Sequence, residues 1–297
     1  MYGENHYYGH SALLLRHCEL PLGTVIPARL QHGWQVGAGM PLGPLREPGP
    51  KLLWGQRNLD AARAEGHTEL MAIGAPFLYL PPVDVTPLDD RSLLVIPFHG
   101  WEREALEGSM VQYADAIETL VGEGFGPVTV CMYWFEYAQA ALRSCFESRG
   151  FATTTMGHRD ANPDFLVRQR ELLLRHAFVT SNRVSTAAFY GLYSGRPFFL
   201  WGPPQGLSAG DDPTGEAFDR WQGETFPELA WDRFDGGCRQ ETGARELGLE
   251  FRRPPQALIE ALALGPAHRW RRARLRVRKA VHTTRRKLGL LPALDTP

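Results

Sequence analysis

The chain of 297 residues lacks the features typical of secreted, disulfide-bonded or membrane-spanning proteins. Its four cysteines, Cys18, Cys131, Cys145 and Cys238, form no CxxC pair, which indicates reduced thiols rather than a disulfide framework or a zinc site. No window approaches the roughly 18 consecutive apolar residues of a membrane span. The first residues show no basic region followed by an apolar core, so no secretory signal is visible. We therefore expect a cytoplasmic protein.

Common metal and cofactor motifs are also missing. There is no DxD triplet, and no HExxH or GxxxxGK[ST] motif. The stretch GEGFG at 122–126 falls between an expected helix and an expected strand, which is the wrong order for a dinucleotide fingerprint. The adjacent acidic pairs at 89–90 and 211–212 suit loops better than a metal clamp. We expect no resident metal and no cofactor.

The net charge of −1 conceals a basic segment near the C-terminus. Residues 269–287 contain ten Arg or Lys and no acid, so the remainder has 22 basic against 33 acidic residues, a net charge of about −11. Six residues, most of them apolar, fall on one narrow stripe of a helical wheel: Trp270, Ala273, Val277, Val281, Thr284 and Leu288. This pattern is typical of a helix lying on anionic lipid. A solvated tail and a nucleic-acid-binding tail are the alternatives, but no RNA-binding module accompanies it, so we expect no nucleic acid.

Strands and helices alternate regularly after a linker rich in proline and acids at 80–90. Five apolar strands are expected within 92–100, 127–135, 151–157, 177–181 and 197–202. Helices are expected between them, at 110–124, 137–150, 163–176 and 184–195, and a later helix is expected at 255–264. This alternation predicts βαβ units and a parallel sheet that is covered on both faces.

A shorter alternation precedes the linker. Helices are expected at 10–18 and 56–67, and strands within 23–34, 51–55 and 69–80. The sequence therefore predicts an α/β protein with two Rossmann-like lobes, a small one at 1–90 and a larger one at 91–265. A basic amphipathic tail follows at 266–297. Two such lobes usually form a cleft where their strand carboxyl ends face one another.

The polar turn TSNRVST follows the fourth strand of the larger lobe. It offers hydroxyl and amide groups at Thr180, Ser181, Asn182, Ser185 and Thr186. Ser185 or Thr186 suits the N-cap of the next helix, whose free amides favour a phosphate. Simple capping without a ligand is the alternative interpretation.

Three other strand ends are expected at the same rim of the sheet. They contribute His99, Gly100 and Glu102, then Tyr133 and Trp134, then His158 and Arg159. Aromatic rings can stack on a base, and an arginine can pair with a diphosphate. Each residue alone is as well explained by core packing or solvation. Their convergence on one edge predicts donor binding.

His32 lies at the end of an expected strand of the smaller lobe, directly before Gly33. Because the pKa of histidine lies near neutrality, His32 can serve as a general base toward a hydroxyl. A hydrogen-bonded structural histidine is the alternative.

The order of these motifs resembles bacterial GT-B glycosyltransferases and glycerophosphotransferases of surface-polysaccharide assembly. The resemblance covers most of residues 20–265 through QHG, IGAPFLYL, PFHGWE, the TSN turn, SGRPFFLWG and ARELGLEFRRPPQALIEAL. It implies a nucleotide-activated donor in the larger lobe, an acceptor hydroxyl approaching from the smaller lobe, and no bound metal. His32 matches the early His-Gly as base, and His99 matches the later His-Gly near the donor phosphate. Arg159 and the turn residues Ser181, Asn182, Ser185 and Thr186 would hold the diphosphate.

The predicted function is metal-independent transfer of a sugar or polyol phosphate from a nucleotide-activated donor. The acceptor would be a cell-envelope or capsular glycan, or a lipid-linked precursor, at the inner face of the plasma membrane. A nucleotide-sugar epimerase of the same architecture is one alternative, with Glu102 and Glu136 as the only obvious cleft carboxylates. The other is a non-catalytic GT-B-like scaffold that the tail holds at the membrane.

Overall fold

The computed structural model describes residues 3–40, 45–46, 49–100, 104–160 and 162–266, and five positions of the tail. By its internal contacts the chain divides into two units. The small unit comprises residues 1–80 together with 248–297, and the large unit comprises residues 81–247.

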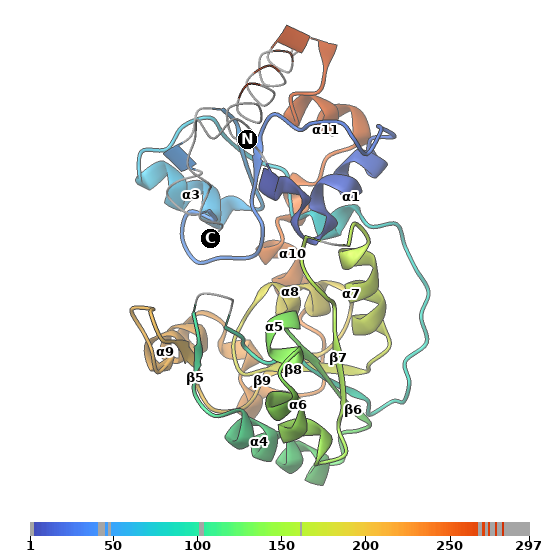
Figure 1. The fold of residues 1–297 in the computed structure, drawn as a ribbon, viewed down its shortest axis with the longest axis vertical. Coiled ribbons are helices and arrows are strands. Elements are labelled where there is room, and N and C mark those ends of the chain that lie inside the picture. The colour runs from blue at the N-terminus through green and yellow to red at the C-terminus, as the bar shows by residue number, and fades with distance from the viewer. Residues whose placement is uncertain are drawn as a thin grey trace. The chain divides into compact units, whose positions relative to one another are not determined.

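The large unit is built on a five-stranded parallel sheet with the order β7-β6-β4-β8-β9 (Figure 1). Its strands are β4 (Leu93–Val95), β6 (Val128–Met132), β7 (Ala152–Thr155), β8 (Phe178–Ser181) and β9 (Phe198–Leu200). Along the chain, β6 and then β7 are added on one side of β4, and β8 and then β9 are added on its other side. The order therefore reverses between β4 and β8, and ligands of open α/β sheets bind at the carboxyl ends of strands at such a point.

Helices cover both faces of this sheet, with α4 and α6 on one face and α7 and α8 on the other (Figure 1). The helices of the unit are α4 (Met110–Gly122), α5 (Trp134–Tyr137), α6 (Ala140–Glu147), α7 (Phe165–Leu174), α8 (Thr186–Tyr193), α9 (Glu216–Thr225) and α10 (Gln240–Glu246). Ser109 caps α4, because its hydroxyl accepts the amide hydrogen of Gln112 at 3.2 Å. Tyr113 and Ile117 of α4 pack with Val130 and Phe199 in a fully buried cluster.

The small unit contains a three-stranded parallel sheet with the order β1-β2-β3. Its elements are η1 (Gly3–Gly9), α1 (His10–His17), β1 (Arg29–Leu30), β2 (Lys51–Leu53), α3 (Gln56–Ala64), β3 (Leu70–Ala72), η2 (Pro76–Tyr79), η5 (Leu249–Phe251) and α11 (Pro255–Ala261). Leu53, Leu59 and Ala62 form the buried core between α3 and the sheet. The α/β class with two parallel sheets, expected from the alternation of strands and helices, is confirmed.

The segment from residue 248 onward differs from the expectation, because it groups with the small unit and not with the larger lobe. Arg252 donates from Nε to the carbonyl oxygen of Leu78 at 2.9 Å, and Arg253 donates from Nη2 to that of Ala72 at 3.1 Å. Gly248 has a φ of +70°, and a Cβ there would lie 2.0 Å from the carbonyl oxygen of Trp54. The close approach of these two backbones therefore requires glycine at the boundary.

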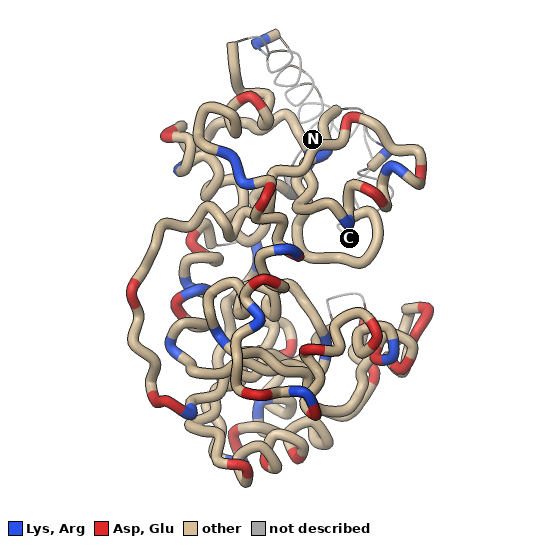
Figure 2. Tube along the Cα trace, turned by 180° about the vertical axis from the view of Figure 1, so that it is seen from behind, with Lys and Arg blue, Asp and Glu red and all other residues tan. Residues whose placement is uncertain are grey.

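Residues 81–90 connect the two units without forming a helix or strand, and they carry acidic residues (Figure 2). Among the helices that the structure describes, none combines the length and the apolar character needed to cross a membrane.

The tail is described at Arg269, Trp270, Ala273, Val277 and Val281, all helical and exposed. Trp270 is 84% exposed, Val277 63% and Val281 48%. The other positions of the predicted amphipathic helix, Thr284 and Leu288 included, lie outside the described residues.

Candidate functional site

Aromatic and histidine rings from three strand ends form a continuous row at the carboxyl edge of the large sheet. His158, which follows β7, packs against Trp134, which follows β6, with ring centroids 4.6 Å apart. Tyr133, next to Trp134, stacks on His99 beyond β4 at 4.2 Å and an interplanar angle of 10°. The structure therefore brings together four side chains that the sequence placed at one rim.

Asn182 ties the turn after β8 to its neighbours on both sides. Its Oδ1 accepts the amide hydrogen of Phe98 at 3.0 Å, and its Nδ2 donates to the carbonyl oxygen of Pro203 at 3.0 Å and to Oε1 of Gln205 at 2.9 Å. Because Phe98 follows β4 and Pro203 follows β9, this buried amide joins three strand ends. Its predicted contact with a donor stays a prediction.

The hydroxyls of Thr180 and Ser181 also have partners within the protein. Thr180 is fully buried and donates from Oγ1 to the carbonyl oxygen of Phe199 at 2.8 Å. Ser181 accepts the amide hydrogen of Arg183 at 3.2 Å. These bonds shape the turn, and contact of either hydroxyl with a phosphate stays a prediction.

Ser185 occupies the N-cap position of α8, in extended conformation, but its side chain makes no capping hydrogen bond. The amide hydrogen of Val184 is donated to Oε1 of Gln222 at 2.8 Å. Ser185 and Thr186 are half-buried at the start of the helix. Here backbone amides and hydroxyls meet the carboxyl edge of the sheet, which suits an anion.

Arg183 places a cation at the point where the strand order reverses. Its guanidinium carbon lies 4.2 Å from the ring centroid of Phe98 and 3.6 Å from that of Phe218. Its Nη1 donates to the carbonyl oxygen of Gln205 at 3.1 Å. Burial lowers its pKa, yet a guanidinium stays protonated at neutral pH. The sequence-based prediction missed Arg183, because it weighed only the hydroxyls and amide of the turn.

Glu136 is a buried carboxylate beside the same rim. Its Oε1 accepts the amide hydrogen of Gly100 at 2.7 Å. A Cβ at Gly100 would lie 2.6 Å from the carbonyl oxygen of Glu104, so the loop after β4 requires glycine here.

Glu102 lies outside the described residues. Arg159, the residue after His158, lies with Nε 3.7 Å from Oδ1 of Asp160 in an ion pair.

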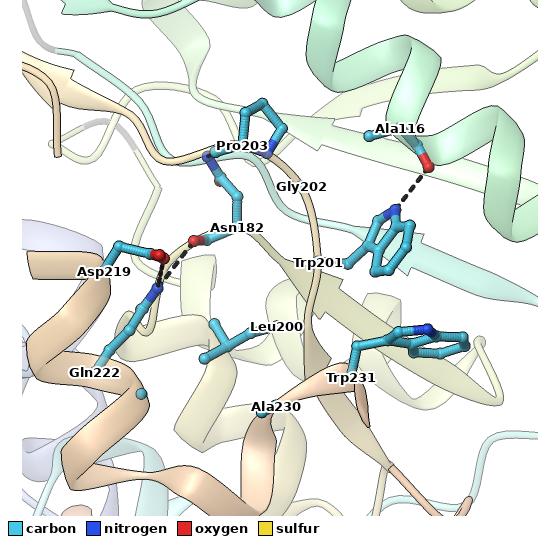
Figure 3. A pocket seen from close by; sticks show the side chains of 11 residues that line it. Ala116, Asn182, Leu200, Trp201, Gly202, Pro203, Asp219, Gln222, Ala230 and Trp231 are labelled. Carbon is cyan, nitrogen blue, oxygen red and sulfur yellow. Dashed lines mark hydrogen bonds between the residues drawn. The ribbon is translucent and has the colours of Figure 1, made fainter. Parts of the chain in front are cut away.

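A cavity of about 450 Å³ opens next to Asn182, in the size range of small-molecule sites (Figure 3). Trp201 and Trp231 contribute indole walls, and Trp201 is fixed by a 2.6 Å hydrogen bond from Nε1 to the carbonyl oxygen of Ala116. Gln222 reaches in from α9, donating from Nε2 to Oδ1 of Asp219 at 2.8 Å (Figure 3). Of this lining only Asn182 was among the predicted site residues.

In the small unit, His32 follows β1 in a loop held by buried amides. Gln31 accepts the amide hydrogen of Trp54 at 2.9 Å and donates to the carbonyl oxygen of Gly33 at 2.8 Å. Asn58 donates to the carbonyl oxygens of Gln35 and Gly37 at 3.1 and 2.8 Å. The half-buried ring of His32 packs edge-on against Tyr7 at 5.0 Å. Its loop is therefore preorganised.

Within the described ranges, no three His, Cys, Asp or Glu side chains gather as metal ligands.

Comparison with known proteins yields matches only among solved structures. No protein-family model matches the chain, and no curated protein does. Ten solved chains match. The chain is similar to a co-structure of S. aureus MnaA with UDP, at a TM-score of 0.47 and 9% identity, covering 80% of this chain and 68% of that one. The fold assignment rests on the strand orders of the two sheets.

Proposed function

We propose that the protein is a GT-B-like transferase that moves a sugar or polyol phosphate from a nucleotide-activated donor to a hydroxyl of a cell-envelope or capsular glycan. The observation that carries the proposal is the ring row His99, Tyr133, Trp134 and His158, which leads to the strand-order reversal at Asn182 and Arg183. Such a row combines stacking surfaces with a fixed cation at a position where α/β sheets bind nucleotides.

The donor would use three kinds of group at this edge. The exposed ring of His99 and the half-buried rings beside it would stack on the base, and the cavity beside Trp201 would take a further ring of the donor. The guanidinium groups of Arg159 and Arg183 and the amides at the start of α8 would oppose the diphosphate charge. No metal is needed in this scheme, because these groups stabilise the leaving phosphate.

The acceptor hydroxyl would be activated from the small unit. As the new bond to the transferred group forms, the hydroxyl proton passes to the His32 imidazole. The bond to the nucleotide phosphate breaks, and its electron pair leaves with the nucleotide. The amide network of Gln31 and Asn58 supports this role, because it fixes the loop that carries His32.

The basic tail would hold the enzyme on anionic lipid at the inner face of the plasma membrane, near a lipid-linked acceptor. The exposure of Trp270, Val277 and Val281 supports this, because an apolar stripe flanked by Arg and Lys suits a lipid surface.

A nucleotide-sugar epimerase is the second candidate, and Glu136 favours it. This carboxylate is buried next to the loop that carries His99, where it could exchange a proton with a bound sugar. Incubation of the protein with a nucleotide-sugar and no acceptor separates the two candidates. An epimer appearing in the NMR spectrum identifies the epimerase.

The transferase proposal is tested by binding of UDP-, GDP-, CDP- and CMP-sugars, scored by thermal shift and calorimetry. We expect one nucleotide class to bind, and Tyr133→Ala to weaken it by about tenfold, the loss of roughly 1.4 kcal/mol of stacking. Trp270→Ala, which removes an exposed aromatic ring outside the large unit, should leave affinity unchanged. His32→Ala should abolish transfer but not donor binding. If no nucleotide binds the wild-type protein, the proposal is wrong.

A further inference from the structure

His10, the first residue of α1, is a buried histidine. Its side chain is 1% exposed, and its ring lies 6.2 Å from that of Trp54 and 5.7 Å from that of Tyr8. Neither Nδ1 nor Nε2 has a hydrogen-bond partner among the described residues. A neutral imidazole has one N–H donor and one lone pair, and leaving both unpaired in the interior is costly.

A second buried histidine shows the ordinary structural arrangement. His176 meets the carbonyl oxygen of Leu172 through Nδ1 and the hydroxyl of Thr129 through Nε2, each at 2.9 Å. Both of its ring nitrogens are satisfied, as expected of a histidine that serves packing alone. His10 differs on this point, although a phenylalanine or leucine would fill its site without unpaired polar atoms.

Two contact routes lead from His10 to His32. In the first, the ring of His10 packs on Trp54, whose Nε1 donates to the carbonyl oxygen of Gln31 at 3.2 Å, the residue directly before His32. In the second, Tyr8 packs on His10 while the adjacent Tyr7 packs on His32. Burial, together with the charge of His32, lowers the pKa of His10 to about 3, so its ring is neutral at neutral pH.

We propose that His10 is a positioning residue for His32. Its neutral ring hydrogen bonds to a water or hydroxyl enclosed between the two imidazoles, and this bond determines which nitrogen of His32 carries the proton. A neutral imidazole suits this role, because it donates and accepts at once and does not repel His32 when that ring gains a proton. The catalytic part of the inference rests on the proposed function, in which His32 is the base.

The test is ¹⁵N NMR of the histidine rings in the full-length chain. We expect one dominant tautomer of His32 in the wild-type protein and a mixture of both in His10→Phe, which keeps the ring volume and removes both nitrogens. His10→Gln retains a donor and an acceptor and should keep the wild-type tautomer. His17→Phe, on the same helix, is the matched control and should leave His32 unchanged.

The inference is overturned if the His32 tautomer is the same in the wild-type protein and in His10→Phe. It is also overturned if His10→Gln disturbs His32 as much as His10→Phe does. Should His10→Phe not fold, His10→Leu, which also removes both ring nitrogens, takes its place, and an unchanged His32 tautomer in that variant overturns the inference. The readout needs no nucleotide, so failure of donor binding would refute the transferase and leave the link between the two histidines standing.

Discussion

Gly202, two residues after the end of β9 and at the cavity wall, has a backbone conformation that only glycine adopts readily. Its φ is +114°, and a Cβ there would lie 2.3 Å from Cε2 of Tyr113, a fully buried ring. Backbone strain and overpacking would therefore act together in Gly202→Ala. We expect a loss of about 2 to 4 kcal/mol in the free energy of unfolding.

Urea unfolding of this variant has a matched control within the same cavity lining. Gly223, inside α9, has open space where its Cβ would be. Gly223→Ala should therefore stabilise the protein by up to about 1 kcal/mol, through helix propensity. Equal urea midpoints of unfolding for Gly202→Ala and Gly223→Ala would show that a Cβ at position 202 does not clash with Tyr113.

Arg183 gives a second prediction for a single residue. Its planar guanidinium lies against the rings of Phe98 and Phe218, and a lysine ammonium cannot stack in this way. We expect Arg183→Lys to lower the free energy of unfolding by about 1 to 2 kcal/mol. Arg168→Lys, at an exposed position of α7, should have no measurable effect. A thermal-melt series that finds both substitutions neutral contradicts the assigned stacking.

At the scale of elements, the sequence predicted every strand of the large parallel sheet, because each is rich in apolar or β-branched residues and is separated from the next by a helix. It did not predict the antiparallel pair of β5 (Leu106–Glu107) and β10 (Gly206–Leu207). Two residues per strand carry no periodic signal. The pairing partner lies about a hundred positions away and is set by tertiary contacts.

The sequence predicted the strand-end residues of the candidate site but not its cavity. His99, Tyr133, Trp134 and His158 could be placed together, because parallel strands end at one edge of a sheet. The cavity beside Trp201 could not, since it depends on how α9 and the loop after β9 pack on α4. That packing requires contacts between segments with no shared sequence pattern.

The tail helix is the element whose function can be tested by itself. Replacing Trp270, Val277 and Val281 by serine would remove exposed apolar surface and keep every Arg and Lys. Because apolar burial adds to electrostatic attraction at a lipid surface, we expect binding to vesicles of phosphatidylcholine and phosphatidylglycerol to fall at least tenfold. Vesicles of phosphatidylcholine alone carry no net charge and serve as the control for the electrostatic part of the binding.

Deletion of residues 268–297 should release the protein from the vesicles without unfolding it, and equal binding by this truncated form would refute the lipid role.

At the scale of the whole molecule, the chain leaves the small unit at residue 80 and returns to it at residue 248. The small unit is thus assembled from two segments that lie far apart in the sequence. The hydrophobic pattern of 255–264 predicted a helix but could not indicate which sheet it packs on. The decisive contacts are the hydrogen bonds of Arg252 and Arg253 to the end of the first segment.

This arrangement predicts that cutting the linker leaves the small unit intact. A specific protease site inserted between Val83 and Asp84, both exposed, would separate the N-terminal segment from the rest of the chain. We expect the two fragments to elute together in size-exclusion chromatography, because Arg253 donates its amide hydrogen to the Tyr79 hydroxyl at 3.1 Å and its Nη2 hydrogen to Ala72. The two fragments should separate only in urea.

Arg253→Ala should speed the dissociation of the two fragments, whereas Arg245→Ala, at an exposed position of α10, should not. Immediate release of the N-terminal fragment after cleavage would show that residues 248–264 do not hold the small unit together.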